Sequence, residues 1–381
     1  MKKFSLILMS LLLTSCSLSS YETRNLEQNP VLTISLPSPS YALALRNLWN
    51  RTYPECADAL KFKVTENEFH QQFQSDIEWV KDSDAIYKKH YAMQIDIINE
   101  YPVDQLEREE LAGYFQPIEA HGLLYSYSQP KVDDYDLDLQ QLQNFETYQK
   151  KHSIYYSHTI EQVLPYWLSN YHHEETVMDE VFMDDEFLSC IENMKQFYKE
   201  YALEDDPYIQ ENFYDMDYMS GLISTDDIQK QRLYKDQLLH FIGMPQSENQ
   251  QFYPMADVYG FMVSDDCNYK NSAKAFMDLV RSKEGIQAYL GAEEGIAVLD
   301  QEDIDDFFIY DSLRKEMIVA MNGSKLWDLS VICDKPSVRY KDLYKKTDMV
   351  SILQNGIVAD KSAREIQQEI HEHVADWIRK Q

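Results

Sequence analysis

Cys16 is the residue whose position most clearly predicts covalent chemistry, because it closes a basic and then apolar leader. Lys2 and Lys3 give the leader a positive start, and residues 4–13 are predominantly apolar. This run has about ten residues, which is within the range of ~7–15 for a secretory signal peptide. It is too short to span a bilayer, which needs ~20 apolar residues. The leader therefore predicts export, with residues 1–15 removed as a signal peptide.

The segment Leu13-Thr14-Ser15-Cys16 resembles a bacterial lipobox, in which small residues precede a cysteine. The resemblance implies that the Cys16 thiol receives a diacylglyceryl group and that cleavage makes Cys16 the first mature residue. One acyl chain anchors a protein only marginally, so the two or three chains of a bacterial lipoprotein suit stable attachment. An ordinary leader with an incidental cysteine is the alternative. We expect attachment to the extracytoplasmic face of the cell membrane.

The net charge argues against two classes of partner. At −30, the chain repels phosphate backbones, so we expect no nucleic-acid partner. It also repels anionic lipid headgroups, so membrane attachment must depend on the lipid at Cys16. Hydrophobic residues make up 44% and aromatic residues 13%, which predicts folded cores rather than disorder. A chain of 381 residues is long enough for two domains.

No recognisable reactive centre follows the leader. The remaining cysteines lie far apart without metal-ligand spacing, and buried free thiols are expected, although three disulfide pairings stay open: Cys56, Cys190, Cys267 and Cys333. Asp134, Asp136 and Asp138 begin like an EF-hand loop, but the required glycine and terminal glutamate are missing. Neither GxSxG, Walker A nor GxGxxG occurs. We therefore expect a non-enzymatic protein without a metal or cofactor.

The N-terminal part of the mature chain has the pattern of a βαβ unit. Apolar and polar residues alternate over 32–36 and 60–64, which predicts two half-buried strands. Between them, apolar residues at helical spacing predict a helix over 42–53, stopped by Pro54. Such units build parallel sheets. A third strand is predicted over 77–80.

The rest of the chain is more helical. Apolar residues at three- and four-residue intervals predict helices over 137–150, 187–201, 273–280, 286–290 and 363–378, with a short strand over 259–263. Trp49, Trp79 and Trp377 lie on periodic apolar faces and are expected in the core.

In this order, the chain resembles the extracellular solute-binding lipoproteins of carbohydrate ABC importers, which are related to maltose-binding proteins. Leu32–Leu36, the Trp49-bearing helix ending at Tyr53-Pro54, and Leu60–Val64 are similar to that family's first βαβ unit. The segments similar to its later helices and carboxyl terminus are Asn271–Asp278, Ser282–Gln287 and Ile352–Gly356.

The resemblance implies a helix-rich α/β fold of the two-lobed periplasmic-binding-protein type (type II) with hinge crossings. Lobe 1 would comprise 31–124 and 252–300, lobe 2 would comprise 125–251 and 301–381, and 16–30 would be a tether. The ligand would bind between the lobes, at the carboxyl ends of strands. Closure about the hinge would then present the loaded protein to the importer's permease subunits.

A sugar needs aromatic side chains for its apolar faces and polar side chains for its hydroxyls. The candidate ligand-binding residues are Tyr41, Asp82, Tyr127, Tyr166, Trp167, Tyr259 and Tyr344. Tyr41 and Asp82 follow predicted strands, and Tyr259 begins one. The resemblance places Tyr127 at the first crossing and Tyr344 near the family's carboxyl-terminal stacking aromatic. Pro165-Tyr166-Trp167 resembles a segment that contributes sugar contacts in maltose-binding relatives.

Two other function classes stay open. Low glycine content and an acidic, tyrosine-rich middle are compatible with a mostly helical surface lipoprotein that binds a protein or scaffolds the envelope. Export and abundant carboxylates are compatible with a secreted hydrolase. The predicted small-molecule partner is a solute of the sugar type.

Overall fold

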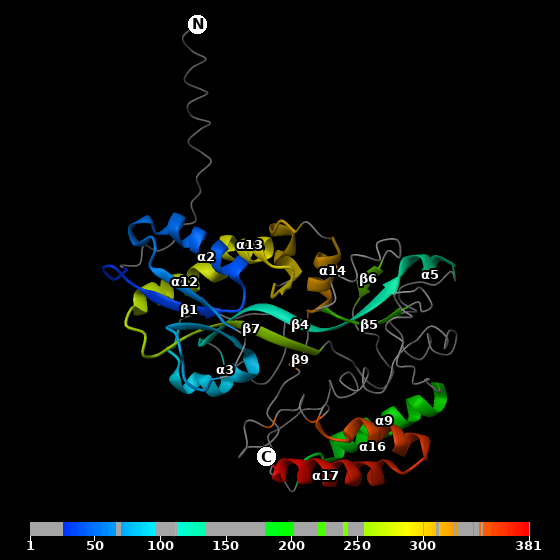
Figure 1. The fold of residues 1–381 in the computed structure, drawn as a ribbon. Coiled ribbons are helices and arrows are strands. Elements are labelled where there is room, and N and C mark those ends of the chain that lie inside the picture. The colour runs from blue at the N-terminus through cyan, green and yellow to red at the C-terminus, as the bar shows by residue number, and fades with distance from the viewer. Residues whose placement is uncertain are drawn as a thin grey trace.

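The computed structural model describes residues 26–65, 70–95, 111, 113–134, 180–201, 220–225, 239–242, 255–299, 301–309, 312–322, 325–326, 338, 343 and 346–380. Figure 1 shows a sheet with helices on both of its faces, and a separate group of helices near the C-terminus. Cys16, Tyr166, Trp167 and Tyr344 and the helix predicted over 137–150 lie outside the described residues.

The first elements form the predicted βαβ unit. Strand β1 (Leu32–Leu36) leads into helix α2 (Pro39–Thr52), and β2 (Leu60–Val64) pairs with β1 in parallel. Ser38 caps α2 by accepting a hydrogen bond from the Tyr41 backbone N–H. The short helix η1 (Pro54–Cys56) follows α2, as expected where a proline ends a helix.

Two long strands join this unit to the rest of the chain. Strand β3 (Ile77–Lys81) is parallel to β1 and antiparallel to β7 (Met255–Val263), which in turn pairs with β4 (Phe115–Ser128). The sheet order is β2-β1-β3-β7-β4-β5, where β5 is Ser220–Ser224. The predicted strands over 77–80 and 259–263 are therefore confirmed, the second as the end of a longer strand.

Short strands complete the sheet at its far end. Strands β6 (Leu239–Ile242) and β8 (Ile296–Ala297) pair with β4, and β9 (Lys325–Leu326) pairs with β7. The remaining short elements are η2 (Lys89–Tyr91), α5 (Gln129–Asp134) and η6 (Gln301–Asp306).

The pairing of β4 with β7 depends on a close backbone approach at Gly260. The register shifts between Pro117 and Glu119, and Gly260 lies opposite this irregularity. A Cβ at Gly260 would overlap the backbone carbonyl of Gln116. Glycine therefore lets the two strands cross in contact.

Helices cover both faces of the sheet, as Figure 1 shows. Helices α2, α12 (Lys270–Arg281), α13 (Lys283–Ala292) and α14 (Ser312–Ala320) lie on one face, and α3 (Asp82–Lys88) lies on the other. The core between sheet and helices contains the fully buried Trp49, Phe261 and Phe276. Glu27, in the segment predicted as a tether, accepts hydrogen bonds from Asn271 and Ser272 at the start of α12.

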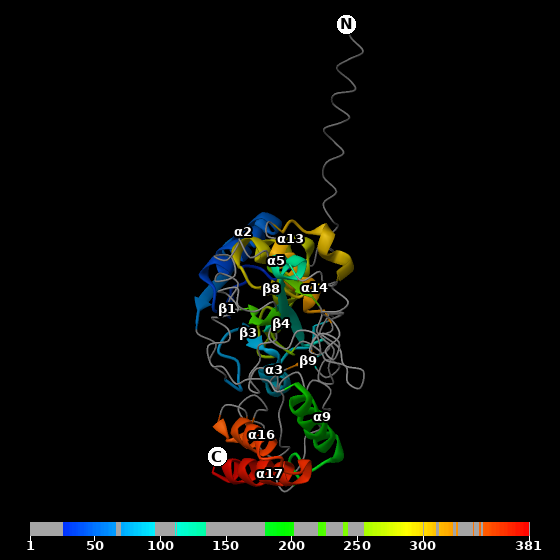
Figure 2. The same ribbon diagram turned by 90° about the vertical axis from the view of Figure 1, so that its right-hand side faces the viewer.

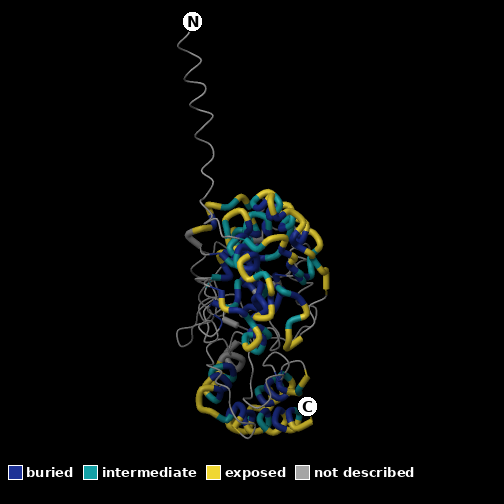
Figure 3. The backbone as a smooth tube through the Cα atoms, turned by 90° about the vertical axis from the view of Figure 1, so that its left-hand side faces the viewer, coloured by how far each residue is buried: buried dark blue, intermediate teal, exposed yellow. Residues whose placement is uncertain are grey.

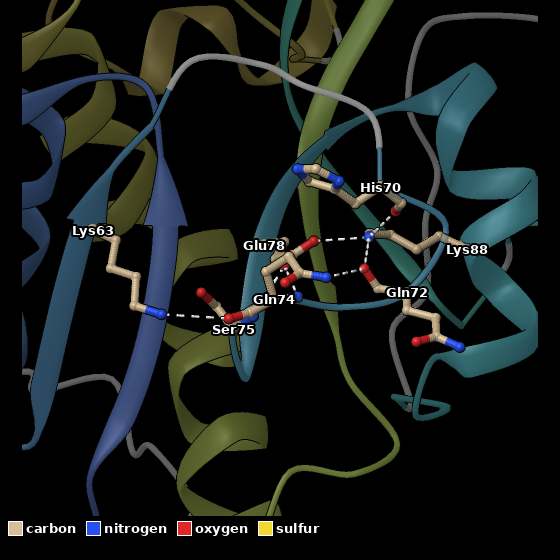
Figure 4. Close-up of polar contacts among 7 residues, drawn as sticks. All are labelled: Lys63, His70, Gln72, Gln74, Ser75, Glu78 and Lys88. Carbon is tan, nitrogen blue, oxygen red and sulfur yellow. Dashed lines mark hydrogen bonds and ion pairs between the residues drawn. The ribbon is translucent and has the colours of Figure 1, made fainter.

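A buried ion pair holds the loop between β2 and β3 (Figure 4). Lys88 Nζ lies 2.8 Å from Glu78 Oε2 and donates to the Gln72 carbonyl at 3.1 Å and to the His70 carbonyl. Glu78 Oε1 accepts from the Ser75 N–H at 3.0 Å and from the Gln74 N–H. Each charge is thus surrounded by hydrogen-bond partners, the condition under which a buried ion pair is tolerated.

Three helices form the C-terminal group, and the two views agree on their proximity (Figures 1 and 2). They are α9 (Asp185–Tyr201), α16 (Met349–Val358) and α17 (Ala363–Arg379). Ser362 and Glu365 form a capping box at the start of α17. The predicted apolar stripe of α17 is buried against its neighbours, as Figure 3 shows, although Trp377 is only half-buried.

The described cysteines are free and buried, as expected for three of the four: Cys56, Cys190 and Cys267. Cys333 lies outside the described residues.

Candidate functional site

A pocket of about 680 Å³ lies at the carboxyl end of β1, where β3, β7 and β4 run side by side. Its lining residues are Leu36, Pro37, Ser38, Pro39, Ser40, Tyr41, Trp79, Glu119, His121, Asp257, Tyr259, Tyr289 and Glu293. The volume is in the range of small-molecule sites, and the carboxyl ends of parallel strands are a common location for them.

The antiparallel pairing of β4 and β7 places four polar side chains together. Glu119 lies opposite Tyr259, and His121 lies opposite Asp257. Alternate residues of a strand share a face, so all four side chains point to the same side of the sheet. His121 and Tyr259 pack edge to face with ring centroids 5.2 Å apart.

Aromatic rings form the inner wall of the pocket. Tyr41 packs edge to face on Tyr289 at 5.3 Å and on Trp79 at 6.2 Å between ring centroids. Tyr41 comes from the first turn of α2, Tyr289 from α13 and Trp79 from β3. Because such geometry fixes aromatic rings relative to one another, the wall is preformed.

An ion pair and a histidine–carboxylate contact lie on the strand side of the pocket. Lys81 Nζ lies 3.0 Å from Asp257 Oδ1, and His121 Nε2 lies 3.0 Å from Glu119 Oε1. Burial and the Asp257 charge raise the pKa of Tyr259 far above its ordinary value, so Tyr259 offers a neutral hydroxyl at any physiological pH.

Glu293 lies on the helix side of the pocket. Its carboxylate accepts a hydrogen bond from the Ser38 hydroxyl. Burial, assisted by the Glu119 charge, raises the pKa of Glu293 above its ordinary value. Glu119 and Glu293, which are far apart in the sequence, therefore both line the pocket.

Gly295 leaves room for the polar end of this wall. A Cβ at Gly295 would overlap the Glu119 carboxylate and the Tyr289 hydroxyl. Burial and the Glu119 charge raise the pKa of Tyr289 well above its ordinary value, so this hydroxyl also stays protonated.

Of the described ligand-binding candidates, Tyr41 and Tyr259 line the pocket together. Asp82 is buried at the start of α3, where its carboxylate accepts from the Ser83 N–H, and it does not line the pocket. Tyr127 is buried near the end of β4 and stacks on His240, also outside this pocket.

Sequence reasoning missed several lining residues. Trp79, expected in the core, is indeed buried but also lines the pocket. The others are Glu119, His121, Asp257, Tyr289 and Glu293. A signal existed for Asp257, because it lies two residues before Tyr259 and therefore shares its face of the strand.

The described helices include none with the length and apolar character needed to cross a bilayer. Within the described ranges, His, Cys, Asp and Glu side chains form no group of three or more that could hold a metal ion.

The fold is similar to that of solved extracellular solute-binding proteins. A Staphylococcus aureus extracellular solute-binding protein in complex with maltose superposes with a TM-score of 0.68 and 11% identity over 93% of this chain and 99% of its own. The Listeria monocytogenes maltose-binding periplasmic protein MalE, also in complex with maltose, has a TM-score of 0.64 and 11% identity. The match covers 93% of this chain and 99% of MalE. UspC of M. tuberculosis has a TM-score of 0.68 and 10% identity, and the match covers 91% of this chain and 99% of UspC.

These likenesses establish the fold, and they confirm the predicted helix-rich α/β architecture of two-lobed solute-binding proteins. No protein-family profile matches the sequence. No curated protein matches it either.

Proposed function

We propose that this chain is a lipid-anchored, extracytoplasmic solute-binding protein that captures a carbohydrate and delivers it to the permease of an ABC importer. The observation that carries the proposal is the pocket between β1, β4, β7 and α13, in which an aromatic wall faces carboxylates and an imidazole. Aromatic rings suit the C–H faces of a sugar, and carboxylates accept hydrogen bonds from its hydroxyls.

The comparisons support this proposal at the level of fold. Two of the similar structures contain maltose, and both cover nearly the whole chain. Binding proteins of this shape act by hinge closure rather than by catalysis. In this chain the same action would bring a second lobe over the pocket.

The whole pocket belongs to one of the two proposed lobes. Every lining residue falls within 31–124 or 252–300, the two segments proposed as lobe 1. Tyr166, Trp167 and Tyr344 belong to the segments proposed as lobe 2. We propose that these three aromatic residues meet the bound solute from the opposite side when the lobes close.

Ligand binding by the full chain, purified in detergent, tests the proposal. Neutral and charged mono- and disaccharides, amino acids and short peptides are screened by thermal shift. A ligand present at ~100 times its Kd adds ~2.7 kcal/mol, which raises the melting temperature by several degrees. Binding of a sugar supports the proposal. Flat curves for every sugar would overturn it in favour of the protein-binding lipoprotein.

A variant pair ties binding to this pocket. Tyr259→Ala removes a lining ring and is expected to weaken sugar binding at least tenfold, since ring stacking and the hydroxyl contact are both lost, worth about 1.5 kcal/mol or more together. Tyr91→Ala removes an exposed tyrosine outside the pocket and is the matched control. Equal affinities of the two variants would place the sugar elsewhere.

A hydrolase is the alternative function, because two glutamates, Glu119 and Glu293, line the pocket. In this structure Glu119 is paired with His121, and Glu293 accepts from the Ser38 hydroxyl. Both carboxylates therefore have structural partners. Recovery of the intact sugar after prolonged incubation is expected, and release of a hydrolysis product would support the hydrolase instead.

The lipid anchor is tested separately. Cys16→Ser removes the proposed acylation site, so the chain is expected to stay unprocessed or to leave the membrane fraction. Unchanged processing and membrane association would contradict the anchor at Cys16.

A further inference from the structure

The pocket has more negative than positive charge. Its lining contains three carboxylates, Glu119, Asp257 and Glu293, and the imidazole of His121. Lys81 neutralises Asp257 at 3.0 Å, and His121 is the partner of Glu119. Within the described part of the chain, Glu293 has a hydrogen bond from the neutral Ser38 hydroxyl but no ion pair. A negative charge is thus left without a close cation.

Arg314 is a buried cation whose charge acts on Glu293, and it donates hydrogen bonds to backbone carbonyls. Arg314 donates from Nε to the Gly295 carbonyl at 2.8 Å and from Nη1 to the Leu290 carbonyl at 2.9 Å. Its charge acts to lower the pKa of Glu293, but burial of the carboxylate, assisted by the Glu119 charge, prevails and the pKa is raised. The guanidinium therefore does not replace an ion-pair partner.

A second feature of the pocket also calls for a ligand. Tyr41 is only 1% exposed, and its hydroxyl oxygen has no hydrogen-bond partner among the described residues. A buried hydroxyl without a partner is costly, and native structures seldom retain one unless it meets water or a ligand. Burial, assisted by the charges of Glu119 and Glu293, raises the pKa of Tyr41. All three side chains line the same pocket.

We infer that the pocket binds a carbohydrate carrying a protonated amine, in preference to a neutral or acidic sugar. This inference rests on the proposed function and specifies the substrate class of the same site. An ammonium group has three donors and no acceptor, so it matches the Glu119 and Glu293 carboxylates and the Tyr41 hydroxyl oxygen.

The alternatives fit the pocket less well. A neutral sugar satisfies hydrogen bonds but leaves the Glu293 charge uncompensated as closure removes water. A uronic acid brings a further negative charge next to Glu119 and Glu293, and like charges disfavour binding. Among sugars of similar shape, the pocket would therefore bind an amino sugar most tightly and a uronic acid most weakly.

The test is calorimetric titration of the full chain, in detergent, with sugars that differ at one position. D-glucosamine, glucose, N-acetylglucosamine and glucuronate are compared near neutral pH. Three disaccharides of one linkage follow: chitosan dimer, diacetylchitobiose and cellobiose. We expect the two free amines to bind about tenfold or more tighter than their neutral counterparts, and glucuronate to bind most weakly.

Two charge-neutralising variants link the preference to the pocket. Glu293→Gln and Glu119→Gln are expected to reduce the ratio of amine affinity to glucose affinity to about threefold or less. Glu192→Gln, an equal charge change at an exposed position of α9, is expected to keep the full preference. Melting curves show whether each variant folds, and the comparison of sugars on the unmodified chain stands even if one does not.

The outcomes separate the inference from the proposed function. Equal affinity for glucosamine and glucose, or for chitosan dimer and cellobiose, would overturn the inference and leave the sugar-binding function intact. A full preference for amines in both pocket variants would also overturn the inference, because the group that recognises the amine would then be neither Glu119 nor Glu293. Failure of every sugar to bind would overturn both.

Discussion

The Ser38 hydroxyl donates a hydrogen bond to the Glu293 carboxylate and so joins the cap of α2 to the residue that ends α13. The same oxygen accepts from the Tyr41 backbone N–H at 3.1 Å. The start of α2 is therefore held by a carboxylate from far along the chain, which suits the positive end of the helix dipole. This contact fixes both Tyr41 and Glu293 at the edge of the pocket.

The raised pKa of Glu293 predicts a pH dependence of stability. Because the carboxyl binds its proton more tightly when folded, its contribution is greatest below its ordinary pKa of 4.5 and is lost as pH rises through the higher folded value. Glu293→Gln removes this titration and can keep the contact with Ser38. We expect the melting temperature of the variant to gain on that of the parent as pH rises from about 4 to about 7.

Glu192→Gln, on an exposed part of α9, controls for the loss of one negative charge. A melting-temperature difference for Glu293→Gln that is constant with pH, or that reverses in direction, would show that burial does not dominate this carboxyl.

Tyr41→Phe is expected to separate stability from binding. The hydroxyl has no partner among the described residues, so removing it should leave the ligand-free protein unchanged or up to about 1 kcal/mol more stable. Ligand affinity should fall by about five- to tenfold, corresponding to one lost hydrogen bond. Chemical denaturation and calorimetric titration measure the two effects.

Tyr269→Phe, at the cap of α12 and outside the pocket, is the matched control and should not change affinity. A loss of ligand-free stability of more than about 1 kcal/mol in Tyr41→Phe would mean that the hydroxyl has a structural role.

Gly260→Ala is expected to disrupt the contact between β4 and β7. A methyl group there would overlap the Gln116 backbone, which can move only if the strands separate. We expect a loss of about 3 kcal/mol or more in the free energy of unfolding. Gly291→Ala, where no atom lies within 4 Å of the added carbon, should be neutral or stabilise α13 by about 0.5–1 kcal/mol. Similar melting temperatures of the two variants would contradict the close approach.

Lys88→Ala is expected to destabilise the fold by about 3–5 kcal/mol, because it leaves Glu78 buried without its cation. Lys315→Ala removes a lysine from an exposed pair with Asp305 and should cost no more than about 1 kcal/mol. Urea unfolding compares the two. The double variant Glu78→Gln/Lys88→Met, in which no charge stays unpaired, should recover part of the loss, and failure to do so would assign the cost to packing instead.

Local patterns were sufficient for the first βαβ unit and for several later strands and helices, but not for β4. The alternation over β1 and β2 and the helical spacing in α2 predicted a parallel βαβ unit, and the structure has one. The apolar stripe that predicted α17 is buried. The spacing of apolar residues within a short segment indicates which face is buried. A strand or an amphipathic helix can therefore be recognised before its partner is known.

The candidate site was only partly accessible in this way. Tyr41 and Tyr259 were predicted because they lie next to the ends of recognisable strands. Glu119 and Glu293 gave no local signal among 65 acidic residues. What singles them out is the pairing of β4 with β7 and the end of α13 lying against the start of α2.

The sequence by itself thus determined the first βαβ unit, several later elements and the two tyrosines, since each depends on spacing within a short segment. Only the tertiary structure decided which carboxylates share the pocket with them. The physical reason is that desolvation and charge proximity act through space: Ser38, Glu119, Asp257 and Glu293 are far apart along the chain, and the antiparallel register and helix packing bring them to one wall.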